Sequence, residues 1–593
     1  MFKYLKKYWF WCLLAPVCMF GEIAMDLIQP KIMSSIVDDG VLKSDVGLIL
    51  DLGVRMILLV LFGGLCGTLC GVFANFATRR FGNDLRKALF TKIMNLSFSQ
   101  TDRISTGSLI TRLSNDVNQV EMMVMMFIRM AVRSMCMFIG GIYMLYRISE
   151  KFALLTIGAL PFVMIGVTFF LRKATPMFAV VQKKLDQVNH VMQEDVAGAR
   201  VVKAYVREQY ELDRFDKAND DLVSINLRVQ TLLAFMMPYM NIILNLVVIL
   251  LLHMGAITVK EGSELQIGEL MAALTYVAMI LHSVTFVANI FQSMTRARAS
   301  VARLKEVLDS PDLIEDGDFE AAKARLAEMY KEDGIMEEKK RGSIRFENVS
   351  FAYPSSPDRK VLENIDLEIR PGETFAILGT TGSGKSSFIN LIPRFYDADE
   401  GNVYVDGINV KDYELHELRE RVVTVMQRAE LYSRSIMENI RWGREGATDE
   451  EVYAAARAAQ ADGFIREAQD GYNTHVTEAG HSLSGGQKQR ISIARALLKK
   501  GEILIFDDAT SALDLKTEAA LHKALRAEYS DVTKIIIAQR IASVRNADRI
   551  MVLDRGKILA IGTHDELMKS CDLYQDIFRS QLKEDKKEVT ANE

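Results

Sequence analysis

Long apolar stretches recur through roughly the first 300 of the 593 residues and then stop. Leu, Ile, Val, Met, Phe and Gly dominate six of them, at residues 8–30, 49–78, 122–146, 152–171, 232–256 and 267–291. Each reaches the length of about 20 residues that a helix needs to cross a hydrocarbon core of about 30 Å. The sequence therefore predicts an all-α domain with six spans in a lipid bilayer.

The alternative is a large soluble protein with six buried helices, but the confinement of the stretches to one half of the chain argues against it. Lys3, Lys6 and Lys7 lead straight into a first stretch that is too long for the core of a signal peptide, so we expect no cleavable signal. Basic residues stay on the cytoplasmic side of a membrane. We therefore expect the N-terminus in the cytoplasm, and six crossings return the chain to it.

After the last stretch the pattern changes to short apolar runs separated by helical segments. The expected strands are SIRFENVSFAYP, ENIDLEIR, TFAILG, EILIFDD, KIIIAQR and RIMVLD. This alternation is typical of an α/β domain with a largely parallel sheet that is covered on both faces. We expect four segments: a membrane domain at residues 1–310, a charged linker at 311–342, the α/β domain at 343–581 and a polar tail at 582–593. The membrane domain is expected to have long cytoplasmic excursions at 79–121 and 172–231.

The strand TFAILG runs into a glycine-rich loop with the phosphate-binding pattern G-x-x-x-x-G-K-[ST]. Its glycines let backbone N–H groups turn toward phosphates. We expect Lys385 to reach the β- and γ-phosphates and Ser386 to bind Mg²⁺, with Asp507 at the end of ILIFD as the carboxylate associated with the metal. The sequence thus predicts ATP and Mg²⁺ as cofactors, held by a loop of Gly379, Thr380, Thr381, Gly382, Ser383, Gly384, Lys385, Ser386 and Ser387.

The string LSGGQ precedes an amphipathic segment, KQRISIARALL. A glycine pair in that position can be an ordinary turn and helix cap. The whole string, however, resembles the signature of ATP-binding cassette (ABC) proteins, and the chain resembles ABC exporters of the six-span half-transporter type over nearly its whole length. The resemblance is carried by the phosphate loop, the Asp507 strand, the signature residues Leu483, Ser484, Gly485, Gly486 and Gln487, and the SALD string of Ser511, Ala512, Leu513 and Asp514.

This resemblance implies a six-helix transmembrane domain followed by an α/β P-loop nucleotide-binding domain. It implies that Tyr353 stacks on adenine and that Gln427 lies near Mg²⁺ and the attacking water. It also implies two cassettes, with each nucleotide held between the phosphate loop of one chain and the LSGGQ of the other. This chain has one cassette, so the second must come from a partner.

Two positions depart from the family pattern, which has a glutamate after the metal-associated aspartate and a histidine on a later strand. Here these residues are Asp508 and Gln539. A carboxylate one methylene shorter retreats by about 1 Å, which can cost about a hundredfold in a positioned reaction. An amide cannot carry an imidazolium charge. The alternative is drift in a site that still hydrolyses ATP, in a homodimeric transporter with slow turnover.

We therefore interpret the chain as the degenerate-site subunit of a heterodimeric, multidrug-type exporter. Its own site would bind ATP and hydrolyse it poorly at Asp508, Gln539 and Gln427. Its LSGGQ would complete the hydrolytic site of a partner half-transporter that carries the glutamate and the histidine. The rival interpretation is a regulatory or channel-like membrane protein gated by nucleotide, which would pass its substrate only downhill.

Ionisable residues inside spans are costly unless they pair or face water. Glu22, Asp26, Arg129 and Arg133 are therefore candidates for the substrate pathway, although they can equally pair with one another. The excursion tips at 98–113 and 208–215 match the coupling helices of the family. The substrate is expected to be amphiphilic: drug-like, a lipid or a peptide, and not a nucleic acid. The expected location is a bacterial inner membrane with the nucleotide-binding domain in the cytoplasm.

Overall fold

The structure is a computed structural model that describes residues 1, 3–260, 265–311, 313–332, 341–477, 480 and 482–591. The chain forms two compact units. Residues Met1–Met94 and Gly107–Ser310 make the first, and Asn95–Thr106 with Pro311–Glu593 make the second.

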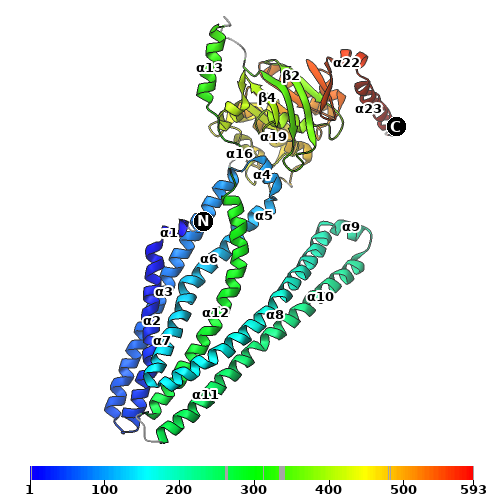
Figure 1. Ribbon diagram of the computed structural model, residues 1–593. Helices are drawn as coiled ribbons and strands as arrows, with labels where there is room; N and C mark the ends of the chain where they lie inside the picture. The colour runs from blue at the N-terminus through cyan, green and yellow to red at the C-terminus, as the bar shows by residue number, and fades with distance from the viewer. Residues whose placement is uncertain are drawn as a thin grey trace. The chain divides into compact units, whose positions relative to one another are not determined.

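The first unit is a set of long helices (Figure 1). Six helical segments are long and apolar enough to cross a membrane, which confirms the six predicted spans. Two of the helices, with 49 and 48 residues, extend far beyond the bilayer thickness. The helices are α1 (Lys3–Lys6), α2 (Trp9–Ser35), α3 (Val46–Met94), α5 (Thr106–Thr111), α6 (Val117–Met126), α7 (Val132–Ile148), α8 (Glu150–Ala197), α9 (Ala199–Ala204), α10 (Glu208–Ala234), α11 (Met236–Lys260) and α12 (Ile267–Leu308).

Close helix packing in this unit depends on small residues. A Cβ atom on Gly82 of α3 would lie 1.7 Å from Oε1 of Glu121 on α6, so only glycine fits there. Glu121 is buried and forms ion pairs with Arg79 at 3.1 Å and Arg86 at 2.7 Å. The charge of this carboxylate is therefore balanced by two arginines of α3.

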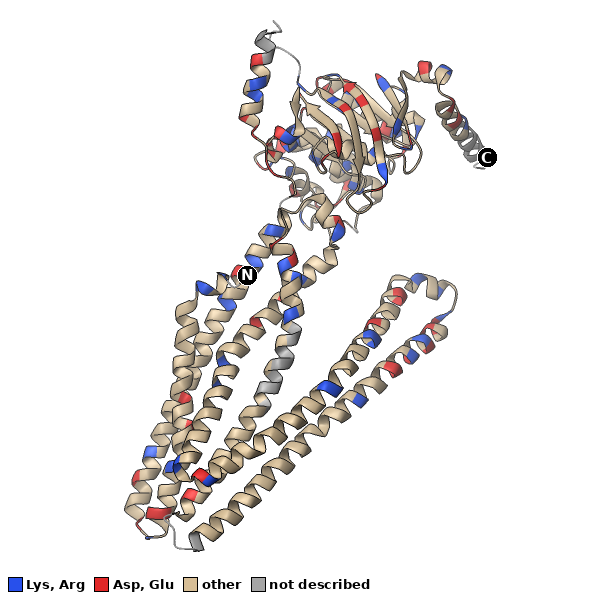
Figure 2. Cartoon of the chain, in the orientation of Figure 1, with Lys and Arg blue, Asp and Glu red and all other residues tan. Residues whose placement is uncertain are grey.

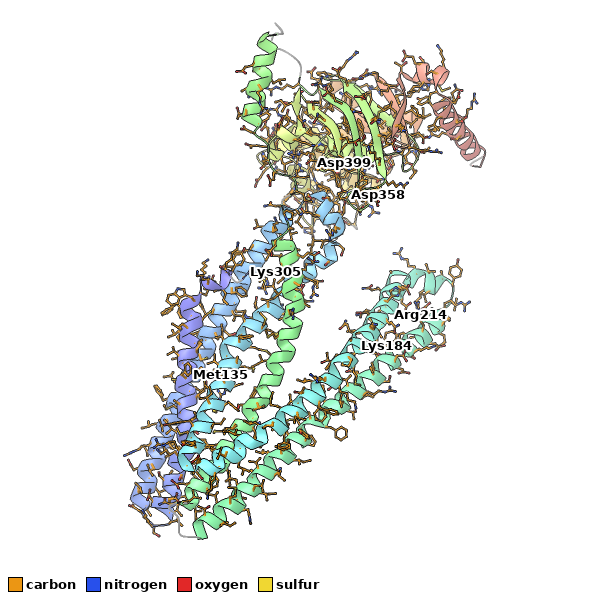
Figure 3. All side chains as sticks on the ribbon, in the orientation of Figure 1. Met135, Lys184, Arg214, Lys305, Asp358 and Asp399 are labelled. Atoms are coloured by element: carbon orange, nitrogen blue, oxygen red, sulfur yellow. The ribbon has the colours of Figure 1, made fainter. Side chains whose placement is uncertain are left out.

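Charged side chains concentrate on the helix extensions and are sparse along the spans (Figure 2). On the pair α8 and α10, Lys184 bonds Asp221 at 2.6 Å and Arg214 pairs with Glu194 (Figure 3). Helix α9 turns the chain between α8 and α10. Residues 208–215, which we expected at the tip, therefore begin the returning helix, and the turn itself lies at α9.

The second unit contains two sheets. The six-stranded sheet has the order β10-β9-β3-β8-β7-β6 and is parallel except for β10. The four-stranded sheet has the order β2-β1-β4-β5 and is antiparallel. The strands are β1 (Ile344–Ala352), β2 (Lys360–Ile369), β3 (Thr374–Leu378), β4 (Glu400–Val405), β5 (Ile408–Asn409), β6 (Val422–Val425), β7 (Ile503–Asp507), β8 (Thr533–Ile537), β9 (Arg549–Asp554) and β10 (Lys557–Gly562).

The predicted α/β domain is confirmed, but SIRFENVSFAYP and ENIDLEIR do not belong to its parallel sheet. They form β1 and β2, which pair antiparallel. Residues 353–359 between them are too few for the helical crossover that parallel strands require. The helices of this unit are α4 (Phe98–Arg103), α13 (Phe319–Glu332), α14 (Lys385–Leu391), α15 (Leu415–Arg421), α16 (Ile436–Arg441), α17 (Asp449–Ala458), α18 (Asp462–Glu467), α19 (Gly485–Lys499), α20 (Leu515–Glu528), α21 (Ile541–Val544), α22 (His564–Ser570) and α23 (Asp572–Ala591).

The segment expected as a charged linker contains α13, which packs on the α/β domain. Phe319 stacks on Tyr413 with 4.8 Å between ring centroids, and Ala322 is buried. Helix α4, from the first expected excursion, also lies in this unit. Phe98 stacks on Phe395 at 4.3 Å, and the Tyr396 hydroxyl donates to Asp102. This tip therefore contacts the cassette directly.

Candidate nucleotide-binding site

Two central strands of the parallel sheet bring the predicted phosphate loop and Asp507 together. Strand β3 ends just before the loop and β7 ends at Asp507, and both pair with β8 in parallel. The carboxyl ends of parallel strands meet at the same edge of a sheet, where ligands of open α/β sheets bind. Ser386, in the first turn of α14, donates a hydrogen bond of 3.1 Å to Asp507.

The loop has the backbone that anion binding requires. Gly382 and Gly384 have φ values of +81° and +104°, which are strained for any residue with a side chain. A Cβ on Gly384 would also lie 2.9 Å from the carbonyl of Val361. The Ser383 hydroxyl is buried and has no hydrogen-bond partner among the described residues. These features fit a loop shaped around phosphate oxygens.

Lys385 folds back onto the loop. Its Nζ donates to the carbonyls of Gly379 and Thr380, at 2.8 Å each. Burial lowers the pKa of this lysine, and the nearby carboxylates of Asp508 and Asp507 oppose the shift. Its ammonium is thus held where the loop surrounds the expected phosphates, with weak neutral acceptors that an anion can replace.

The carboxylate of Asp508 is surrounded by amide side chains. Nε2 of Gln539 donates to its Oδ2 at 3.0 Å, and Nε2 of Gln427 lies 3.5 Å from the same oxygen. Asp508 is only 8% exposed and has a φ of +49°, a left-handed conformation that aspartate tolerates better than most residues. Burial raises the pKa of Asp508, and the two amide hydrogen bonds oppose this. The three predicted residues are therefore brought together.

Sequence reasoning missed a third glutamine at this point. Gln581 of α23 accepts a hydrogen bond from the Ile541 N–H at 2.9 Å and donates one to the Gln539 carbonyl at 2.7 Å. Its side chain thus bridges the backbone on both sides of Arg540. Another missed residue, Gln489 of α19, donates to the Gln427 carbonyl at 3.3 Å. Gln581 belongs to no motif, whereas Gln489 lies two residues after the LSGGQ string; the fold brings both to the site.

The predicted adenine-stacking residue, Tyr353, lies beside the phosphate loop. Its hydroxyl forms a hydrogen bond of 2.9 Å with Ser387. Its ring meets Phe351 and Tyr396 edge-on, with centroids 5.0 and 5.3 Å away. The ring is partly buried. These contacts fix its orientation next to the loop.

The signature residues form the N-terminus of α19. Ser484 is the N-cap residue and accepts from the Gln487 N–H, while Gln487 accepts from the Ser484 N–H at 2.9 Å. This capping box leaves Gly485 open: a Cβ there would meet nothing nearer than Ala512 Cβ at 3.9 Å. A Cβ on Gly486 would lie 2.9 Å from the Ala512 carbonyl, so that glycine is needed for packing against the SALD string. Asp514 ends this string and caps α20 through the Thr517 N–H at 2.9 Å.

In the membrane unit, three of the four candidate pathway residues form one ion-paired cluster. The guanidinium of Arg133 bonds Glu22 with one nitrogen and Asp26 with the other, the latter at 3.0 Å. This is the structural pairing that the sequence left open beside substrate contact. Arg129 is exposed and lies one turn away, outside this cluster.

Comparisons with known proteins agree with this architecture. A family model described as "ABC transporter transmembrane region" matches residues 12–284, and one described as "ABC transporter" matches residues 362–511. The chain is 38% identical over 580 residues to the uncharacterized ABC transporter ATP-binding protein YfiB of Bacillus subtilis, covering 98% of both chains. It is 36% identical over 564 residues to the uncharacterized protein Rv1273c of Mycobacterium tuberculosis, covering 94% of this chain and 93% of the other.

Two further similarities concern proteins with more informative descriptions. An ATP-dependent lipid A-core flippase of Syntrophus aciditrophicus is 31% identical over 582 residues, which covers 98% of this chain and 94% of the flippase. The structure of a bacterial Atm1-family ABC exporter with ATP bound superposes with a TM-score of 0.77, at 24% identity, over 97% of this chain and 98% of that one. The latter similarity shows the fold.

Proposed function

Because the chain belongs to the ABC transporter family, as an exporter half-transporter with its membrane and nucleotide-binding domains fused, we propose that it is the degenerate-site subunit of a heterodimeric exporter. The chain is an integral membrane protein with six transmembrane helices, and its cassette binds ATP. ABC exporters function as dimers. The proposal concerns which partner completes this dimer and where ATP is hydrolysed.

The observation that carries the proposal is the hydrogen bond between Asp508 and Gln539. A residue in the position of Asp508 has to accept a proton from, or orient, the attacking water. Here the side chain is one methylene shorter than the glutamate of the family pattern, and its carboxylate accepts a hydrogen bond from the amide of Gln539. The neutral amide also cannot supply the positive charge of a histidine. This arrangement supports a site that binds ATP and turns it over slowly.

The binding residues of the same site are intact. Lys385 and the glycines of the loop fit the phosphates, and Tyr353 fits the adenine. Ser386, Asp507 and Gln427 are the residues that would hold Mg²⁺, since hydroxyl, carboxylate and amide oxygens suit this ion. The ion would supply charge stabilisation to the phosphates, and the protein would supply its orientation. Burial raises the pKa of Asp507, and the hydrogen bond from Ser386 opposes this.

The signature of this chain supports a role in the partner's site. Packing within the chain does not require a glycine at position 485, because an added Cβ would have space there. This space leaves the N-terminus of α19 accessible to a nucleotide held by another subunit. The proposed partner is therefore a half-transporter with the glutamate and the histidine. The similarity to lipid A-core flippases supports an amphiphilic substrate, and the bacterial relatives support a bacterial inner membrane as the location.

The test is to measure ATP binding and ATP turnover of the full-length chain reconstituted alone in lipid. We expect binding with turnover well below the roughly 10 per second that is typical of enzymes. Lys385→Ala should lose the binding, because the ammonium that faces the phosphates is removed. Turnover of about 1–10 per second by the wild-type chain would show that Asp508 is an adequate base. It would then favour the homodimeric alternative.

Gln581 offers a prediction about the geometry of this site. Gln581→Ala removes both hydrogen bonds that hold the backbone around Gln539, each worth about 1 kcal/mol. Part of this loss should appear as ATP affinity weakened by about fivefold, measured by titration with a fluorescent ATP analogue. The matched control is Gln575→Ala on the same helix, whose side chain accepts only from Arg579 among the hydrogen bonds of the described residues. Equal affinities of the two variants would contradict the prediction.

A further inference from the structure

An open groove runs along α3 in the membrane unit. It has a volume of about 770 Å³, and its lining includes Thr68, Val72, Asn75, Phe76 and Arg79. Thr68, Asn75 and Arg79 recur at helical spacing and form a polar edge, beside an apolar floor of Val72 and Phe76. Thr68 and Asn75 lie within the second apolar stretch, where polar residues are costly against lipid and normally face water or a substrate pathway, and Arg79 lies just beyond its end. The groove thus combines a polar edge with an apolar surface that suits a hydrocarbon tail.

Arg129 borders this groove. Its Nη1 lies 4.0 Å from where a Cβ on Gly71 would be, and Gly71 also lines the groove. Arg129 is exposed, and it makes no hydrogen bond or ion pair with any residue that the structure describes. Among the other guanidiniums near the groove, Arg133 pairs with Glu22 and Asp26, and Arg79 pairs with Glu121. Arg80, which also lines the groove, lies over the Phe76 ring, 5.3 Å from its centroid.

We infer that Arg129 binds the acidic headgroup of an amphiphilic substrate whose tail lies along the apolar floor of this groove. A guanidinium presents a planar fork of donors that matches phosphate or carboxylate oxygens. A guanidinium that has no partner among the described residues, on a span, gains much from such an anion. This inference rests on the proposed exporter function and adds the sign of the substrate's charge. It disfavours cationic amphiphiles, which the positive charge of Arg129 would repel.

The test uses the full-length chain in neutral maltoside micelles without nucleotide. The probes are a fluorescent dodecyl phosphate and its trimethylammonium analogue, which share one tail. The phosphate probe should bind at least about tenfold more tightly, because charge-assisted hydrogen bonds are worth about 1.5–3 kcal/mol. Arg129→Gln should remove this preference, and Arg129→Lys should keep part of it. Inorganic phosphate should not displace the probe, since it has no tail.

The matched control is Arg55→Gln, which removes an exposed guanidinium of α3 that is paired with Asp51 at 2.7 Å. It should leave the preference unchanged. Equal binding of both probes by the wild-type chain would overturn the inference, as would an unchanged preference in Arg129→Gln. Displacement of the phosphate probe by inorganic phosphate would overturn the inference that the bound molecule needs a hydrocarbon tail. Because no ATP is present, none of these results depends on the degenerate-site proposal.

Discussion

Asp508→Glu combined with Gln539→His is expected to raise the ATP turnover of the chain on its own by about a hundredfold. The longer side chain moves the carboxylate about 1 Å toward the attacking water. The second change replaces the amide that now donates a hydrogen bond to the Asp508 carboxylate with an imidazole that can contact the γ-phosphate. ATP turnover and ATP affinity should be measured together in lipid, so that a gain in rate is separated from a gain in binding.

The single variants serve as controls for this result. Asp508→Glu alone should give a smaller gain, because Gln539 can still bond the new carboxylate. The left-handed backbone of residue 508 favours aspartate over glutamate, so this substitution should lower thermal stability slightly. Asp508→Asn with Gln539→His should stay slow, since the base is lost. If the double variant binds ATP but turns it over no faster than the wild type, these two positions do not explain a degenerate site.

The features that could be predicted from the sequence are those whose residues are contiguous. The six spans follow from apolar length, and the phosphate loop follows from a glycine pattern in a strand-to-helix context. The assignment of β1 and β2 to a parallel sheet was wrong because apolar runs do not reveal pairing partners. The length of the connection at 353–359 was the available signal, since parallel strands need a longer crossover.

The parts of the site that sequence reasoning missed depend on long-range packing. Gln581 lies 42 residues from Gln539 in sequence, on a helix with no motif, and meets it only because α23 packs near the end of β8. Likewise, the sequence made Arg129 and Arg133 equal candidates for the substrate pathway. The sequence could not predict that Arg133 alone would form ion pairs with both Glu22 and Asp26. Such choices depend on the positions of neighbouring helices.

Gly485→Asp is expected to lower the ATP turnover of the assembled heterodimer by about a hundredfold or more, the scale seen when charge stabilisation of a transition state is lost. Space for the new side chain exists within this chain, and an acidic residue in the first turn of α19 suits the helix dipole. The domain should therefore fold normally. The damage should arise because a carboxylate at this position repels the phosphates of the partner's nucleotide.

Two comparisons in the same complex make this prediction specific to the signature. Gly463→Asp is the same change at an exposed glycine of α18 with no atom within 4 Å of an added Cβ, and it should leave turnover unchanged. Asp508→Ala should lower turnover by less than about twofold, because this site contributes little hydrolysis of its own. Turnover should be measured on the purified heterodimer. If Asp508→Ala proved more damaging than Gly485→Asp, hydrolysis would occur at this chain's own site and its assignment as degenerate would be wrong.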